Sequence, residues 1–309
     1  MKVKPERNRE LKHASWIGII GNSLLAVVKI VIGFISGSLA VIGDGIDSLS
    51  DVFTYFITLF TTRLIGKPPD SKYPYGYRKA ETISTKVLSF IIFFAGAQLL
   101  ISTASRLISG EEREMPSIIA IYVTILSIIG KVILATWQFK IGKRTDSSMI
   151  IANAKNMRND ILISASVLVG LFFTFILKMP VLDVITAMLV SIWIIKVAFN
   201  IFQESNLELM DGMQDTEMYF KVFKEVDKIK KAHNPHRIRI RKLADVYLIA
   251  MDIEVDGGYT VAEAHNIAKD VENMIKQNIP NVYDVMIHIE PYGNIESDEV
   301  YGISKDNIK

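Results

Sequence analysis

The sequence predicts an α-helical membrane protein with six transmembrane helices, followed by a cytoplasmic α+β domain with the element order αββαβ. Two observations predict this class. The 309 residues are 50% hydrophobic and have a positive mean hydropathy of +0.29, which is unusual for a soluble protein because its surface needs charge. The apolar residues also form long runs from about residue 14 to about residue 205, and the remainder has the mixed composition of a soluble domain. A membrane domain therefore precedes a soluble one.

Six apolar stretches approach the roughly 20 residues that span a bilayer. They cover residues 14–35, 39–63, 82–108, 117–140, 147–177 and 181–203. Lysine and arginine gather before the first stretch, between the second and third, and between the fourth and fifth. Because cytoplasmic loops carry an excess of these residues, we expect both termini in the cytoplasm.

The soluble part begins at residue 211. The spacing of apolar residues predicts an amphipathic helix over 215–232, strands over 236–243 and 246–255, a helix over 261–277 and a strand over 282–290. We therefore divide the chain into a six-helix membrane domain over 1–210, a cytoplasmic domain over 211–292 and a polar tail over 293–309. The composition of the tail predicts that it is mobile.

Composition excludes several classes of function. The chain has no cysteine, so metal ligands must be oxygen or nitrogen atoms. A net charge of +2 without a basic stripe argues against a nucleic-acid partner. No phosphate-binding loop, nucleophile or zinc-protease motif is present, so the sequence does not predict an enzyme.

Carboxylates inside the apolar stretches are the main functional signal. An aspartate at the centre of a spanning helix costs about 2.5 to 3.5 kcal/mol, yet the second stretch contains Asp44, Asp47 and Asp51. Asp47 and Asp51 are four residues apart, and Asn156 and Asp160 in the fifth stretch repeat this spacing. If the two helix faces meet, they form an all-oxygen site suited to divalent cations. The alternative is that these groups cap helix breaks or line a water-filled cavity.

A site of this kind predicts exchange of a metal for a proton. Crowded carboxylates repel one another when all are ionised, so the metal-free site tends to keep a proton that a metal ion displaces. A transporter that uses this exchange is our first hypothesis. A metal-gated channel or a membrane metal sensor with the same site is the alternative.

Two segments resemble the signatures of the cation diffusion facilitator family. Residues 38–51, SLAVIGDGIDSLSD, are similar to its second-helix motif, and residues 75–81, YGYRKAE, to the motif that opens its third helix. The resemblance implies a homodimer in the lipid bilayer that exports divalent transition metals in exchange for protons. The resemblance extends along nearly the whole chain.

The resemblance places the transport site on Asp47, Asp51, Asn156 and Asp160. Zinc and iron transporters of the family have histidine at the position of Asn156, whereas its bacterial manganese exporters have asparagine. Imidazole favours zinc and an all-oxygen shell suits manganese better, so we expect Mn²⁺, with Zn²⁺, Fe²⁺, Co²⁺ and Cd²⁺ as alternatives. The similarity to bacterial members also implies the inner (cytoplasmic) membrane.

Two further family features concern the loop before the third helix. A second metal site of the family would use Asp70 and two histidines, but Tyr73 and Tyr77 stand at the histidine positions. A phenol is a poor ligand at neutral pH, so we expect this site to be absent. Lys79 and Asp211 match a charge pair that links the membrane and soluble domains in related transporters.

The cytoplasmic domain carries four of the five histidines. His288 and Glu290 alternate along a predicted strand and so point to the same side. The resemblance places a cytoplasmic metal site, of structural or regulatory role, on His236, Asp252, His265, His288 and Glu290. The alternative is that these histidines are solvated and bind no metal.

Overall fold

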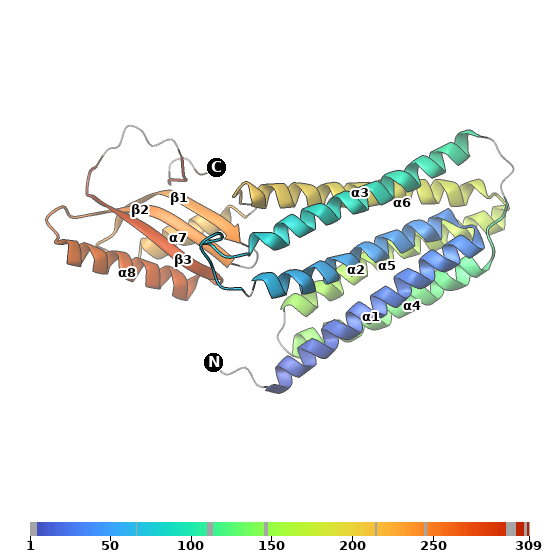
Figure 1. The fold of residues 1–309 in the computed structure, drawn as a ribbon, viewed down its shortest axis with the longest axis horizontal. Coiled ribbons are helices and arrows are strands. Elements are labelled where there is room, and N and C mark those ends of the chain that lie inside the picture. Colours follow the sequence, from blue (N-terminus) through green and yellow to red (C-terminus); the bar gives the residue numbers. More distant parts are fainter. Residues whose placement is uncertain are drawn as a thin grey trace. The chain divides into compact units, whose positions relative to one another are not determined.

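The structure is a computed structural model of the chain. It describes all residues except 1–4, 66, 110–113, 145–147, 214, 244–245, 295–300, 306–307 and 309, and it leaves out some helical side chains. Long helices form the first two thirds of the chain and an α+β domain follows (Figure 1). The long helices are α1 (Pro5–Ser36), α2 (Leu39–Ile65), α3 (Lys79–Ile108), α4 (Ile119–Arg144), α5 (Ser148–Leu177) and α6 (Val181–Leu209).

The long helices confirm the predicted membrane architecture. Within the described residues, α1 and α3 to α6 each contain a segment that is long and apolar enough to cross a bilayer. Some side chains of helix α2, which carries Asp44, Asp47 and Asp51, lie outside the described residues, so the same criterion does not test this helix. Its 27 residues exceed the roughly 20 that a span requires.

Contacts divide the chain into two compact units. The first combines residues 1–63 with 84–202, and the second combines residues 64–83 with 203–309. The loop before α3 thus groups with the residues of the soluble part. The boundaries that we placed at residues 210 and 292 stay predictions.

Apolar packing holds the helices of the first unit together. One buried cluster combines residues of α2, α3, α5 and α6, such as Val41, Leu99, Leu171 and Ile194. Helix α4 packs against α5 and α1. Gly45 permits close packing of α2 on α1, because a Cβ atom there would lie 2.6 Å from Cγ1 of Ile30.

The start of α2 is fixed by a side chain of α6. Asp183 is buried, and its carboxylate accepts hydrogen bonds from the hydroxyl of Ser38 at 2.6 Å and from the backbone N–H of Leu39 at 2.9 Å. These bonds satisfy donors at the amino end of α2 that have no partner within the helix. Asp183 is therefore a helix cap.

The second unit contains a three-stranded sheet with two helices. Strand β2 (Val246–Val255) pairs antiparallel with β1 (His233–Leu243) and parallel with β3 (Val282–Pro291), in the order β1-β2-β3. Apolar side chains of one sheet face form the core with α7 (Glu217–Val226) and α8 (Val261–Asn278). This arrangement confirms the predicted αββαβ order and leaves the opposite sheet face for polar groups.

One expectation about this unit was wrong in detail. Helix α7 ends at Val226 instead of residue 232, because the chain turns there to enter β1 at His233. The mobility of the tail stays a prediction, but part of the tail contacts the rest of the unit. Ile303 pairs with Ile238 of β1 through two backbone hydrogen bonds of 2.9 Å, and Lys305 forms an ion pair with Asp227 at 2.7 Å. The tail therefore extends the contacts of β1.

Candidate metal sites

The structure brings the carboxylates of the predicted transport site together. Asp47 on α2 and Asp160 on α5 are both buried, with 9% of their surface exposed. Asp51 follows Asp47 by one turn of α2, and the charge of Asp160 acts on both side chains. Three carboxylates from two helices therefore face one small region, as an all-oxygen cation site requires.

Asn156 does not join this group in the structure. It lies one turn before Asp160 on α5, but its side chain is exposed, and no contact among the described residues ties it to the carboxylates. The i, i+4 spacing correctly predicts a shared helix face. It does not predict how deeply each side chain of that face is buried.

A lysine of α4 lies directly beside the carboxylates. Lys131 is fully buried, and its Nζ atom is 3.0 Å from Oδ2 of Asp160. The ammonium group also acts electrostatically on Asp51 and Asp44. An ammonium group is thus already present where the predicted site would hold a metal cation.

A second buried lysine joins three helices near the same place. Lys29 on α1 is 2.8 Å from Oδ2 of Asp44 and donates hydrogen bonds to the hydroxyls of Ser48 at 3.1 Å and Ser164 at 2.9 Å. Ser164 on α5 in turn donates to Oδ1 of Asp44 at 2.8 Å. The ammonium therefore has one carboxylate and two hydroxyls as partners, and the network ties α1, α2 and α5 together.

The charges of this buried cluster do not cancel. We define the membrane cluster as the four carboxylates of Asp44, Asp47, Asp51 and Asp160 with the two ammonium groups of Lys29 and Lys131, all among the described side chains. When all six are ionised, two negative charges remain uncompensated. One divalent cation carries the opposite charge.

The sequence contained the signal for both lysines. Each lies inside an apolar stretch, and a lysine at that depth is as costly as an aspartate. The cost argument that marks the aspartates as functional therefore applies equally to these lysines. An ionisable residue of either sign inside a span therefore indicates a partner of the other sign.

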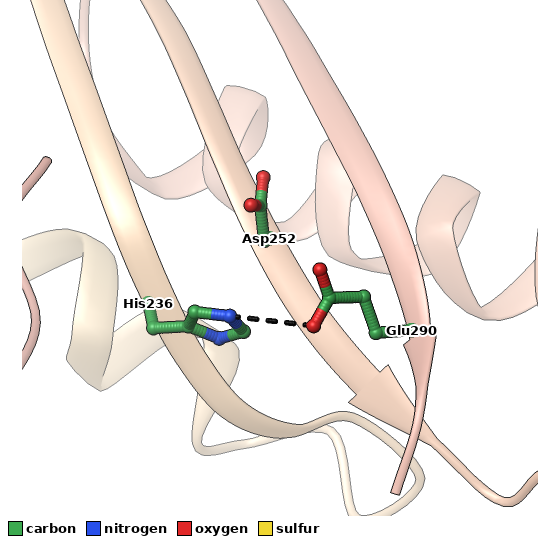
Figure 2. A group of neighbouring side chains, drawn as sticks. All are labelled: His236, Asp252 and Glu290. Atoms are coloured by element: carbon green, nitrogen blue, oxygen red, sulfur yellow. Dashed lines mark ion pairs between the residues drawn. The ribbon is translucent and has the colours of Figure 1, made fainter. Parts of the chain in front are cut away.

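The second candidate site lies on the polar face of the sheet. His236 on β1, Asp252 on β2 and Glu290 on β3 are buried, and each offers an atom within 4.8 Å of the others. Figure 2 shows the imidazole of His236 facing the carboxylate of Glu290, with 3.5 Å between Nε2 and Oε2. Three of the five predicted cytoplasmic ligands thus converge.

A bulge in β1 directs His236 to this face. The pairing of β1 with β2 shifts register between His236 and Arg239, and Arg237 has a φ of 47°. Without the shift His236 would point to the same face as Ile238 and Ile240, which belong to the core. The bulge is what places an imidazole beside two carboxylates.

Local contacts prepare His236 as a ligand. Its Nδ1 lies 2.7 Å from the backbone carbonyl of Asn234 and donates a hydrogen bond to it, so Nε2, which faces Glu290, is the nitrogen that can bind a metal ion in the neutral imidazole. Oε1 of Glu290 is buried and has no hydrogen-bond donor among the residues described. Nε2 of His288 lies 3.7 Å from it. These nitrogen and oxygen donors fit a transition-metal ion.

Asp252 and His265 are placed less favourably for binding a metal ion than His236, His288 and Glu290. Asp252 already has a partner, because Nη1 of Arg237 lies 2.9 Å from its Oδ2, and Arg239 lies at 3.8 Å. His265 is exposed on α8 and is not part of the group. The residues that fit a metal ion best are therefore His236, His288 and Glu290.

The loop before α3 is organised by Asp70 through hydrogen bonds. Its carboxylate accepts from the backbone N–H of Lys72 at 2.9 Å and of Tyr73 at 2.8 Å, and from the hydroxyl of Tyr77 at 2.5 Å. The bond from Tyr77 lowers the pKa of Asp70 and raises the pKa of Tyr77. A phenol that holds its proton more tightly is a still poorer metal ligand.

The predicted charge pair is formed. Nζ of Lys79, the first residue of α3, lies 2.9 Å from Oδ1 of Asp211, and Arg241 approaches the other oxygen at 4.0 Å. Both partners of the Lys79 pair are about 40% exposed, so water screens the attraction. Its role as a link between the domains stays a prediction.

Comparison with known proteins gives matches along the chain. Residues 15–210 match the cation efflux transmembrane domain, and residues 214–292 match the cytoplasmic domain of cation efflux proteins. The uncharacterized transporter YdbO of Bacillus subtilis is 34% identical over 93% of this chain and 98% of its own length. The manganese efflux system protein MneP of the same organism is 29% identical over 93% of this chain and 98% of its own length.

Among the similar solved structures is one that covers the soluble part of this chain. It is the metal-bound C-terminal domain of the CzcD transporter from Thermotoga maritima, which is 41% identical and covers 27% of this chain and 100% of that domain, with a TM-score of 0.26.

The Lys29 network gives a prediction about stability. We expect Lys29→Met to destabilise the protein by about 3 to 5 kcal/mol, because Asp44 would remain buried without its counter-ion. The double variant Lys29→Met with Asp44→Asn removes both charges and should recover most of this loss. Thermal unfolding of the detergent-solubilised protein measures the effect. A double variant no more stable than the single variant would contradict the pairing.

The polar sheet face gives a prediction about metal binding. In a full-length background with Asp160→Asn, we expect His236→Ala to weaken Zn²⁺ binding by at least about tenfold, because it removes the best-oriented nitrogen donor. His265→Ala is the matched control and should leave the affinity unchanged. Titration calorimetry measures both. Equal losses in the two variants would show that the ligand set differs from the one described.

Proposed function

Because this chain belongs to the cation efflux family of membrane transporters, we propose that it exports divalent transition-metal ions, foremost Mn²⁺, from the cytoplasm in exchange for protons. The proposed ligands in the membrane are Asp47, Asp51 and Asp160, with Asn156 completing the shell. The proposed assembly is a homodimer in the inner membrane with both termini in the cytoplasm. Zn²⁺, Fe²⁺, Co²⁺ and Cd²⁺ are the alternative ions.

The observation that carries the proposal is the charge of the membrane cluster. Its four carboxylates and two ammonium groups, all among the described side chains, leave two negative charges in a place where water is scarce. Isolated charges are costly there, so the cluster favours a dication or bound protons over an empty, fully ionised state. Because either a dication or bound protons can neutralise the site, the site is suited to exchange a metal ion for protons.

Manganese is favoured by the ligand chemistry. The carboxylates and the amide of Asn156 offer oxygen, and Mn²⁺ accepts such a shell, whereas Zn²⁺ gains more from imidazole. Asn156 lies one turn from Asp160, and its exposed side chain can turn toward an ion held there. The similarity to the manganese efflux system protein MneP supports the same ion.

The proposal predicts a flux that depends on protons. In proteoliposomes with an acidic interior, we expect Mn²⁺ uptake that saturates with Mn²⁺ and stops when the pH gradient is dissipated. Asp51→Ala and Asp160→Ala should abolish it, because each removes a charge from a shared site. Uptake that ignores the pH gradient and does not saturate would instead favour a metal-gated channel.

The role of Asn156 gives a prediction about selectivity. Asn156→His adds an imidazole at the edge of the carboxylate group, so we expect the ratio of Zn²⁺ to Mn²⁺ uptake to rise. Asn156→Asp keeps an oxygen ligand and is the control that should not favour Zn²⁺. Competitive uptake of the two ions measures the ratio. An unchanged ratio in Asn156→His would refute this account of ion choice.

A further inference from the structure

Lys131 is a buried cation that the proposed exchange reaction does not use. Its ammonium contacts Asp160, which the proposed function assigns as a metal ligand, at 3.0 Å. Lys131 is completely buried, and 12% of the side-chain surface of Asp160 is exposed. The protein thus encloses the ammonium, whereas part of the Asp160 side chain is accessible.

The surroundings of Lys131 differ from those of Lys29. Lys29 has three partners, namely the Asp44 carboxylate and the hydroxyls of Ser48 and Ser164. The Lys131 ammonium, by contrast, has no hydrogen bond of favourable geometry to any described residue and is held by its attraction to Asp160. Two hydroxyls therefore hold Lys29 in addition to its carboxylate, whereas Asp160 is the one carboxylate within ion-pair distance of Lys131 among the described residues.

We propose that Lys131 is a tethered counter-ion that competes with the metal for Asp160 and thereby lowers the metal affinity of the transport site. This inference rests on the proposed function. Without metal, the ammonium offsets part of the carboxylate charge. When a dication binds, Lys131 repels it and shares Asp160 with it, so the ion is held less tightly.

Weaker binding serves transport, because an ion must leave its site as readily as it enters. Three carboxylates in a poorly solvated site would otherwise hold a dication strongly. The positive charge of Lys131 reduces the attraction between the carboxylates and the dication. Lys131 is in this sense a positioning and affinity-setting residue, and it is not itself a metal ligand.

The test is the dependence of transport on Mn²⁺ concentration. For Lys131→Met in proteoliposomes, we expect the KM for Mn²⁺ to fall by at least about tenfold, because the repulsion is lost. The maximal rate should fall as well, because the ion leaves more slowly. Lys131→Arg keeps the positive charge and should retain a KM near that of the wild type.

Lys196→Met is the matched control. Lys196 is a lysine of α6 that lies over the ring of Trp193 and forms no ion pair with a described carboxylate, so its loss should leave KM unchanged. If Lys131→Met does not fold, Mn²⁺ binding to folded Lys131→Gln in detergent replaces the measurement, with the same expected gain in affinity.

The outcomes separate this inference from the function on which it rests. A wild-type protein that does not transport Mn²⁺ overturns the proposed function and this inference with it. A wild type that transports Mn²⁺, together with a Lys131 variant of unchanged or higher KM, overturns this inference alone. If Lys131 has a purely structural role, the Lys131 variant should be less thermally stable, and its KM for Mn²⁺ should not fall.

Discussion

The cost of an unpaired charge among apolar helices is the constraint on which the first unit depends. Asp44 and Lys29 are both completely buried, and neither would be stable there alone. Their pairing requires α1 and α2 to approach closely, which Gly45 permits. The hydroxyl of Ser164 then brings α5 to the same point. The helix positions that create the predicted transport site are therefore set by the need to neutralise charges beside it.

At the predicted metal ligands, the buried charges are only partly neutralised. Asp160 has one ammonium partner, and Asp47 and Asp51 lie close to it. The charge of Asp44 is thus balanced by Lys29, whereas Asp47, Asp51 and Asp160 share the single positive charge of Lys131 and keep an excess of negative charge. The compensated part holds the structure, and the excess charge provides the attraction for a cation. A fold that neutralised every carboxylate would be more rigid, but it would have no electrostatic reason to bind a metal.

On the polar face of the cytoplasmic sheet, too, one carboxylate is neutralised by a basic residue and another is not. Arg237 neutralises Asp252, whereas Glu290 keeps a buried oxygen without a hydrogen-bond donor among the described residues. The bulge that orients His236 also brings Arg237 to its position beside Asp252. The bulge in β1 therefore pairs Asp252 with Arg237 and leaves the Glu290 carboxylate beside His236, where it can bind a metal ion.

Most of the architecture could be predicted because hydropathy and periodicity are local properties of the chain. The six long helices and the αββαβ order follow from them, as does the proximity of Asp47 to Asp51. The ion pair of Lys131 could not be derived in the same way, because it depends on how α4 packs against α5. The exposure of Asn156 and the separation of His265 from the polar sheet face depend likewise on packing. The spacing of residues along a helix or strand predicts which side chains share a face. How close those side chains come to residues of other elements depends on the packing of the whole fold.

The most direct test of the account is a count of the Mn²⁺ ions bound per chain in a full-length protein whose cytoplasmic ligands are removed by His236→Ala and Glu290→Ala. The account predicts one ion per chain, because one dication balances the two uncompensated charges of the membrane cluster. It also predicts that Asp51→Asn in the same background removes this ion. Retention of the ion after that substitution, or no bound ion before it, would contradict the central claim.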